Sequence, residues 1–199
     1  EIYRNHVNAD AYNGPSHGGG VYNTYGTVSA CWIHDNRATS SQGFAYAGGI
    51  ENYLTGTIEN CLITANEAIN GGGVLNQDQM IFCTVYENTA SNGAGILNGK
   101  DGISYFGKIW NSISFGNTGD DLIAETGTTV TFSCFSNATV ENGNIHSDPH
   151  FEDAAGGNFR LHPTSPCRDK ATENIEGLQL FPGLDFDNSP RIKGLKPDM

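Results

Sequence analysis

Two short stretches decide the fold of this chain, GGGVLN at residues 71–76 and CTVYENTA at residues 83–90. The first recurs as GGGVYN at residues 18–23, GGIEN at 48–52 and GAGILN at 93–98. The second recurs as CWIHDNRA at residues 31–38, CLITANEA at 61–68 and NSISFGNT at 111–118. Aligned on their last Asn, the copies of the second motif lie 30, 22 and 29 residues apart. Two motifs that alternate at such spacings form an internal repeat.

Apolar and other residues alternate within each copy, as in CLITAN at residues 61–66. A period of two predicts strands and not helices. A unit of 22 residues can bury only part of its apolar surface alone, whereas stacked copies build a continuous core. We therefore predict that each repeat is one coil of a parallel β-helix. Loops inserted around residues 40–46 and 100–106 then explain the longer steps.

The last Asn of the second motif predicts a ladder. Asn36, Asn66, Asn88 and Asn117 occupy one repeat position, where amides can hydrogen-bond up and down the stack. A row of ligand-binding amides is the functional alternative. Residues 4–9 are expected to be a degenerate further copy of this motif.

The first residue of the same motif is Cys31, Cys61 or Cys83. We expect these side chains to point inward and stack, because free cysteine behaves as a small buried apolar residue. The chain has 5 cysteines, so at least one thiol is unpaired unless a partner chain supplies another. The spacings do not match zinc patterns, which favours buried thiols over a metal.

Composition excludes several classes of function. The 199 residues include 10 Lys and Arg against 22 Asp and Glu, a net charge of −12. Nucleic acids and anionic membranes require clustered cations, so neither is an expected partner. No apolar run is long enough to span a bilayer. With 26 Gly and only 16% charged residues, the chain is predicted to be all-β. It does not begin with Met, and we expect it to be a piece of a longer protein.

The alternating motifs resemble the repeats of bacterial right-handed parallel β-helix proteins, including the polymorphic outer-membrane protein repeat group. The end of the chain is similar to the closing segment of secreted β-helix proteins of the choice-of-anchor Q type. That similarity rests on VTFSC at residues 130–134, GNIHSDPHF at 143–151, GNFRL at 157–161, PTSPCRD at 163–169 and DFDNSPR at 185–191. The resemblance implies an extracellular or bacterial cell-surface location, and the family has no single activity.

Two regions are predicted. Residues 1–140 form the coils, and residues 141–199 form a C-terminal cap or strap. The second region holds six of the 7 prolines and no repeat. A stack of coils needs its ends covered, because the last strand would otherwise offer an open edge.

An enzymatic function is the alternative to binding, and its candidate residues are weak. A polysaccharide lyase needs cations, and the few Lys and Arg residues of the coils share no repeat position. A glycosidase needs paired carboxylates. Asp120 and Asp121 form the one adjacent acidic pair of the coils, similar to the Asp-Asp element of polygalacturonases, whose Gly-His-Gly element is absent. A solvated loop is the competing interpretation of this pair.

No cofactor is predicted, with Ca²⁺ as the single possibility. Asp185 and Asp187 lie in a stretch with the oxygen density of a calcium loop, far short of an EF-hand pattern.

The inserted loops are the preferred ligand sites, because loops on a rigid scaffold commonly carry function. Tyr46 and Tyr105 place aromatic faces there, flanked by Asp101, and we predict that a glycan contacts them. The predicted function is thus a secreted or surface-displayed scaffold that binds an extracellular polysaccharide or a cell-surface glycan, or mediates adhesion. The alternatives are a polysaccharide lyase or glycosidase and a structural stalk or lattice subunit. The sequence does not predict the oligomeric state.

Overall fold

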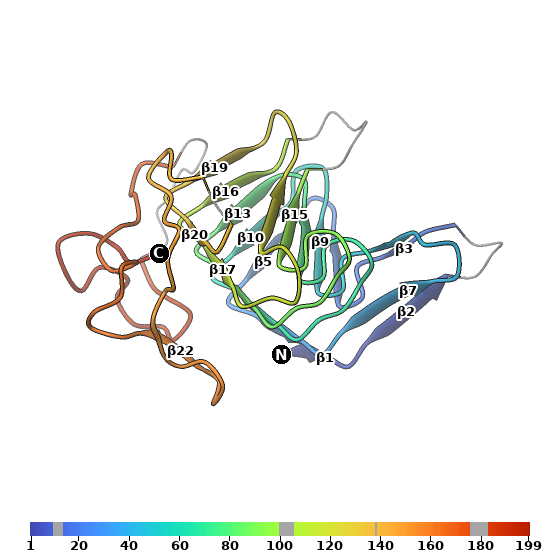
Figure 1. Ribbon diagram of the computed structural model, residues 1–199, viewed down its shortest axis with the longest axis horizontal. Coiled ribbons are helices and arrows are strands. Elements are labelled where there is room, and N and C mark those ends of the chain that lie inside the picture. The colour runs from blue at the N-terminus through green and yellow to red at the C-terminus, as the bar shows by residue number, and fades with distance from the viewer. Residues whose placement is uncertain (10–13, 100–105, 138, 176–182) are drawn as a thin grey trace.

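The computed structural model describes residues 1–9, 14–99, 106–137, 139–175 and 183–199. Every regular element in these residues is a strand, in agreement with the all-β prediction. Three parallel sheets dominate the architecture, and they lie beside one another with each repeat contributing one strand to each sheet (Figure 1).

The strands follow one another in chain order within each sheet. Sheet 1 contains β1 (Ile2–Tyr3), β6 (Trp32–His34), β11 (Leu62–Thr64), β14 (Thr84–Tyr86), β17 (Ile113–Phe115) and β20 (Cys134–Phe135). Sheet 2 contains β5 (Thr27–Ser29), β10 (Thr57–Glu59), β13 (Gln79–Ile81), β16 (Lys108–Trp110) and β19 (Thr129–Thr131). Sheet 3 contains β4 (Val21–Asn23), β9 (Ile50–Asn52), β12 (Val74–Asn76), β15 (Ile96–Asn98) and β18 (Leu122–Ala124).

Equivalent motif residues are paired across neighbouring strands. In sheet 1, Ile63 of β11 pairs with Ile33 on one side and with Val85 on the other. All three are fully buried in one apolar cluster that also receives side chains from sheets 2 and 3. The core thus lies between the three sheets, and the repeat stacks in register as the alternation predicts.

The predicted ladder of four asparagines is present, and a fifth asparagine extends it. The Asn66 backbone N–H and Nδ2 both donate to Oδ1 of Asn88, at 2.9 and 3.0 Å, and Asn36 donates to Asn66 in the same way. Asn5 extends the ladder beyond Asn36, which confirms the degenerate copy near the N-terminus. Because Asn36, Asn66 and Asn88 are buried and bonded to one another, they form a structural ladder and not a ligand-binding row.

A second ladder runs along the end of sheet 3. Asn23, Asn52, Asn76 and Asn98 are buried, and each of the first three donates its Nδ2 to Oδ1 of the next. The distances between donor and acceptor are 2.9, 3.0 and 2.8 Å. The sequence analysis did not predict this ladder, although the Asn that closes the first motif is its signal.

All five cysteines are free. Cys61 and Cys83 are buried in the core cluster, and Cys31 packs against the same cluster while half-buried. The inward stack predicted for the repeated cysteines is therefore present. The neighbouring thiol of Cys83 raises the pKa of Cys61, and burial raises it further. A thiol in this environment stays protonated, which fits a packing role.

Sheets 1 and 2 meet at a row of corner residues in the left-handed conformation, with φ of 48° to 54°. Its members are Ala30, Asn60, Phe82, Asn111 and Phe132. Three of them hold the segment that follows the repeats. The Asn111 side chain donates to the Thr172 carbonyl at 2.8 Å and accepts the Thr172 backbone N–H at 2.9 Å. Arg191 donates to Asn60 Oδ1, and its guanidinium lies 3.8 Å from the centroid of the Phe82 ring.

The closing segment covers both an end and a side of the sheets. Ile145 bridges to Cys134 of the last strand of sheet 1, and the later part runs back beside the corner row (Figure 1). It carries an antiparallel hairpin of β21 (Phe151–Asp153) and β22 (Asn158–Leu161). Arg191 belongs to this docking contact.

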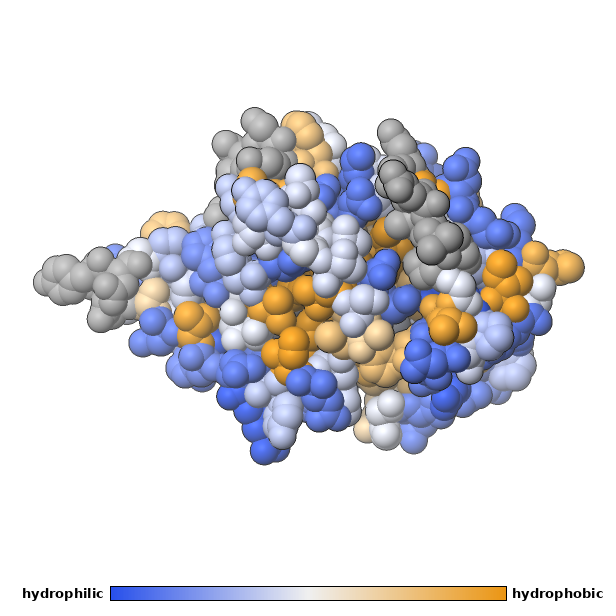
Figure 2. Space-filling view, turned by 180° about the vertical axis from the view of Figure 1, so that it is seen from behind, coloured by the Kyte–Doolittle hydropathy of each residue, from blue (hydrophilic) through white to orange (hydrophobic). Residues whose placement is uncertain are grey.

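Two short parallel pairs extend from the opposite side of the molecule (Figure 1). They are β2 (His6–Ala9) with β7 (Arg37–Ser40), and β3 (Ser16–His17) with β8 (Ala45–Tyr46). The rear face between this extension and the closing segment shows apolar side chains near its middle and hydrophilic ones around them (Figure 2). No described helix is long and apolar enough to cross a membrane.

Candidate functional site

Tyr46, the predicted ligand contact of the first insertion, lies in a cluster of rings. It is the last residue of β8 and pairs in register with His17 of β3. The two rings stack with centroids 5.4 Å apart. His17 also meets the edge of Tyr22 at 5.7 Å, and Tyr22 stacks on Tyr53 at 6.3 Å. These four rings, called the tyrosine cluster below, form one continuous row.

A buried carboxylate lies behind the tyrosine cluster. Glu51 is the middle residue of β9 and pairs with Tyr22 across sheet 3. It is 2% exposed, and its Oε2 lies 2.7 Å from Nδ1 of His17. This contact fixes the imidazole, whose side chain is 34% exposed. Burial and the Glu51 carboxylate together raise the pKa of Tyr22, so its phenol stays a hydrogen-bond donor.

This arrangement combines ring faces with hydrogen-bonding groups at the surface. Tyr22 is 49% exposed, while Tyr46, Tyr53 and His17 are half-buried. Aromatic rings beside a carboxylate and an imidazole can stack on apolar faces and orient hydroxyl groups. A half-exposed imidazole held by a buried carboxylate can also accept and return a proton.

Sequence reasoning found Tyr46 but missed its partners. Glu51 occupies the outward repeat position that Tyr22, Leu75 and Leu97 hold in the other copies. A single carboxylate among apolar and aromatic residues at one repeat position is the signal that would have identified it. Tyr105 and Asp101 of the second insertion lie outside the described residues.

Asp120 and Asp121 do not lie in a site together. Asp120 is exposed, whereas Asp121 is 2% exposed and accepts the Asn117 backbone N–H and Nδ2 at 3.0 and 2.7 Å. Ser136 Oγ also donates to Asp121. The interpretation as a solvated loop is wrong for Asp121. A carboxylate can accept but not pass on a hydrogen bond, so Asp121 ends the asparagine ladder.

Asp185 and Asp187 are engaged in local contacts of the closing segment. Asp185 Oδ1 accepts the backbone N–H groups of Asp187 and Ser189 at 3.0 and 2.9 Å. Asp187 pairs with Arg160 at 2.5 Å, and Lys193 lies 3.5 Å from Asp185. Within the described ranges, no group of three or more His, Cys, Asp or Glu side chains is arranged to hold a metal ion.

Comparison with known proteins adds nothing to this site, because no family model, curated protein or solved structure matches the chain.

Proposed function

We propose that this chain is a right-handed parallel β-helix that serves as a secreted or cell-surface scaffold and binds extracellular glycans. Three parallel sheets with one strand per repeat support the solenoid architecture. The resemblance of the two motifs to bacterial β-helix repeats supports the handedness and an extracellular or bacterial cell-surface location. Buried amide ladders would keep such a scaffold rigid, as adhesion to a glycan-coated surface demands.

The tyrosine cluster backed by Glu51 is the observation that carries this proposal. A pyranose ring has an apolar face of C–H groups that stacks on an aromatic ring, and hydroxyls at its rim that need polar partners. Tyr46 and Tyr22 supply ring faces on either side of His17. His17, oriented by the buried Glu51 carboxylate, would supply a polar partner. Contacts from Tyr105 and Asp101 stay predictions.

The test is the affinity of a panel of neutral and acidic polysaccharides for the unmodified chain and for Tyr22→Ala and Tyr46→Ala. Loss of one stacking ring should weaken binding about fivefold, since such a contact contributes about 1 kcal/mol. Tyr3→Ala removes a comparably exposed tyrosine from sheet 1 and should bind normally. Unchanged affinity in both cluster variants would place binding elsewhere. No polysaccharide binding at all would favour a structural stalk or lattice subunit.

Polysaccharide cleavage is the second candidate, and the His17–Glu51 contact favours it. A buried carboxylate that orients an imidazole is an arrangement found in general-base catalysis. The same incubations should be analysed for new reducing ends and unsaturated sugars. Product release that disappears in His17→Ala would establish cleavage, and its absence in the unmodified chain would leave binding as the function.

A further inference from the structure

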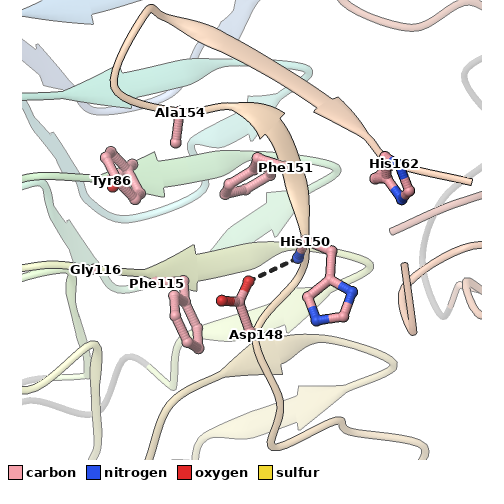
Figure 3. Close-up of a pocket in the computed structure, with 8 residues that line it drawn as sticks. All are labelled: Tyr86, Phe115, Gly116, Asp148, His150, Phe151, Ala154 and His162. Carbon is pink, nitrogen blue, oxygen red and sulfur yellow. Dashed lines mark hydrogen bonds between the residues drawn. The ribbon is translucent and has the colours of Figure 1, made fainter. Parts of the chain in front are cut away.

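A cavity of about 430 Å³ lies between the outer face of sheet 1 and the closing segment (Figure 3). Tyr86 of β14 and Phe115 of β17 line it from the sheet. Asp148, His150 and Phe151 line it from the closing segment. These five side chains surround one space, although more than thirty residues separate the two groups in the sequence.

Aromatic rings form the walls of this cavity and are fixed by a ring behind them. The Tyr86 and Phe151 planes are 87° apart, with centroids separated by 6.1 Å. Phe159 packs against both, at 5.3 Å from Tyr86 and 5.4 Å from Phe151. Phe115 adds a third ring on the sheet side (Figure 3). Rings in nearly perpendicular planes around one space form an aromatic cage.

The Tyr86 ring packs directly against the backbone of Gly116. The φ of Gly116 is +72°, and a Cβ added there would lie 2.6 Å from Cε2 of Tyr86. The equivalent residues before the ladder asparagines are Asp35, Ala65 and Glu87, which carry side chains in the same left-handed conformation. The fold therefore tolerates side chains at this corner, whereas the position of the Tyr86 ring requires glycine at residue 116.

Asp148 is the one carboxylate among the described residues that line the cavity, which also include His150 and His162. The Asp148 carboxylate points between Phe115 and His150, and its Oδ1 accepts the His150 backbone N–H at 2.7 Å, which fixes its rotamer (Figure 3). Of the described residues that line the cavity, none is Lys or Arg. Burial raises the pKa of Tyr86, and the carboxylates of Glu87 and Asp148 raise it further, so this phenol lies in a negative potential.

We propose that this cavity binds an organic ammonium group, such as a lysine side chain, a methylated amine or a choline headgroup. The faces of Tyr86, Phe115 and Phe151 would attract the cation through their ring quadrupoles, and Asp148 would supply the counter-charge. A neutral sugar would gain the ring contacts but not the charge, which is why the ammonium is favoured here. This site is independent of the tyrosine cluster, which lies on β3, β8 and sheet 3.

Choline chloride is a suitable probe, and 3,3-dimethyl-1-butanol is its neutral analogue of the same shape. Binding to the intact chain is measured by titrating each compound and following the NMR chemical shifts of the protein. Choline should saturate one site and bind at least about tenfold more tightly than the alcohol, because the charge supplies most of the selectivity. Asp148→Asn should weaken choline binding about tenfold. Asp120→Asn, which removes an exposed carboxylate outside the cavity, should leave it unchanged.

Gly116→Ala tests the cage itself, because the added methyl displaces the Tyr86 ring. It should abolish choline binding, and a melting curve equal to that of Asp120→Asn would show that the repeats remain folded. Tyr46→Ala should bind choline normally, so failure of the glycan proposal leaves this one standing. Equal affinity for choline and the alcohol, no binding of either, or normal choline binding by Asp148→Asn would overturn the proposal.

Discussion

The repeats and the closing segment hold their shape in different ways. In the repeats, Asn36, Asn66 and Asn88 are at most 1% exposed, and each is bonded to its neighbours above and below. The closing segment is held by contacts that do not repeat. They are the apolar packing of Cys167, Ala171 and Ile175 against the sheets, the docking of Arg191 on Phe82, and ion pairs at the surface. The closing segment also leaves Leu195 92% exposed. A lost contact should therefore weaken the whole body of repeats but only part of the closing segment.

The largest effect is expected from Asn66→Ala. This change removes the Oδ1 that accepts the Asn36 backbone N–H and Nδ2, and the Nδ2 that donates to the Ile33 carbonyl and to Asn88 Oδ1, so four buried hydrogen bonds lose a partner. Each unsatisfied buried group costs about 1–3 kcal/mol, so the free energy of unfolding should fall by about 3 kcal/mol or more. Urea denaturation measures this quantity.

Asn92→Ala is the matched control for that experiment. Asn92 donates its Nδ2 to Asn70 Oδ1 at 3.2 Å, and both residues are only half-buried. Water can replace this bond, so the loss should stay below about 1 kcal/mol. Equal losses in Asn66→Ala and Asn92→Ala would mean that burial of the ladder does not set the stability of the repeats.

A smaller and more local effect is expected from Arg191→Ala. Burial lowers the pKa of Arg191 to about 10, which reflects the cost of placing its charge there. The Phe82 ring, the Leu184 carbonyl at 2.8 Å and Asn60 Oδ1 offset that cost. Without the guanidinium, amide hydrogen exchange should accelerate by about fivefold or more in residues 183–199, with sheets 1 to 3 unaffected.

Arg191→Lys provides the comparison, because it keeps the charge but loses the planar group that stacks on Phe82. Its exchange rates in residues 183–199 should fall between those of Arg191→Ala and the unmodified chain. If Arg191→Ala instead lowers the global free energy of unfolding as much as Asn66→Ala does, the closing segment and the repeats form one cooperative unit.

The sequence predicted what is repeated and missed what occurs once. Asn66 and Cys61 were assigned correctly because other copies carry the same residue at the same position. Asp121 was misread because it takes the place of the next ladder asparagine where no further copy follows. The contact between Arg191 and Phe82 spans more than a hundred residues and has no counterpart among the residues that the structure describes, so no pattern could predict it.

Prediction of the candidate site from the sequence was limited in the same way. Tyr46 was predicted because an insertion interrupts the repeat there. His17 lies before the first complete copy, and its link to Glu51 depends on the register of β3 with β8. The cavity beside sheet 1 joins Tyr86 of a repeat to Asp148 of the closing segment, which only the folded chain brings together.

The smallest effects are expected from two surface ion pairs, one in each region. Arg37 and Glu67 link neighbouring repeats at 2.9 Å and are 53% and 50% exposed. Arg160 and Asp187 link two parts of the closing segment at 2.5 Å and are 63% and 42% exposed. Exposed pairs contribute about 0–1 kcal/mol and are screened by salt, so neither Arg37→Gln nor Arg160→Gln should lower the global free energy of unfolding by more than about 0.5 kcal/mol.

The Arg37→Gln and Arg160→Gln variants should nevertheless differ in hydrogen exchange. The strands around Arg37 are held by the Asn36 ladder, so their protection should not change. The segment around Arg160 is held by the β21–β22 pairing and by packing of Phe159 on Tyr86 and not by an amide ladder, so exchange there should accelerate at low salt and approach that of the unmodified chain at 1 M NaCl, where the pair is screened in both. Equal and unchanged exchange in both variants would show that the closing segment is held as firmly as the repeats.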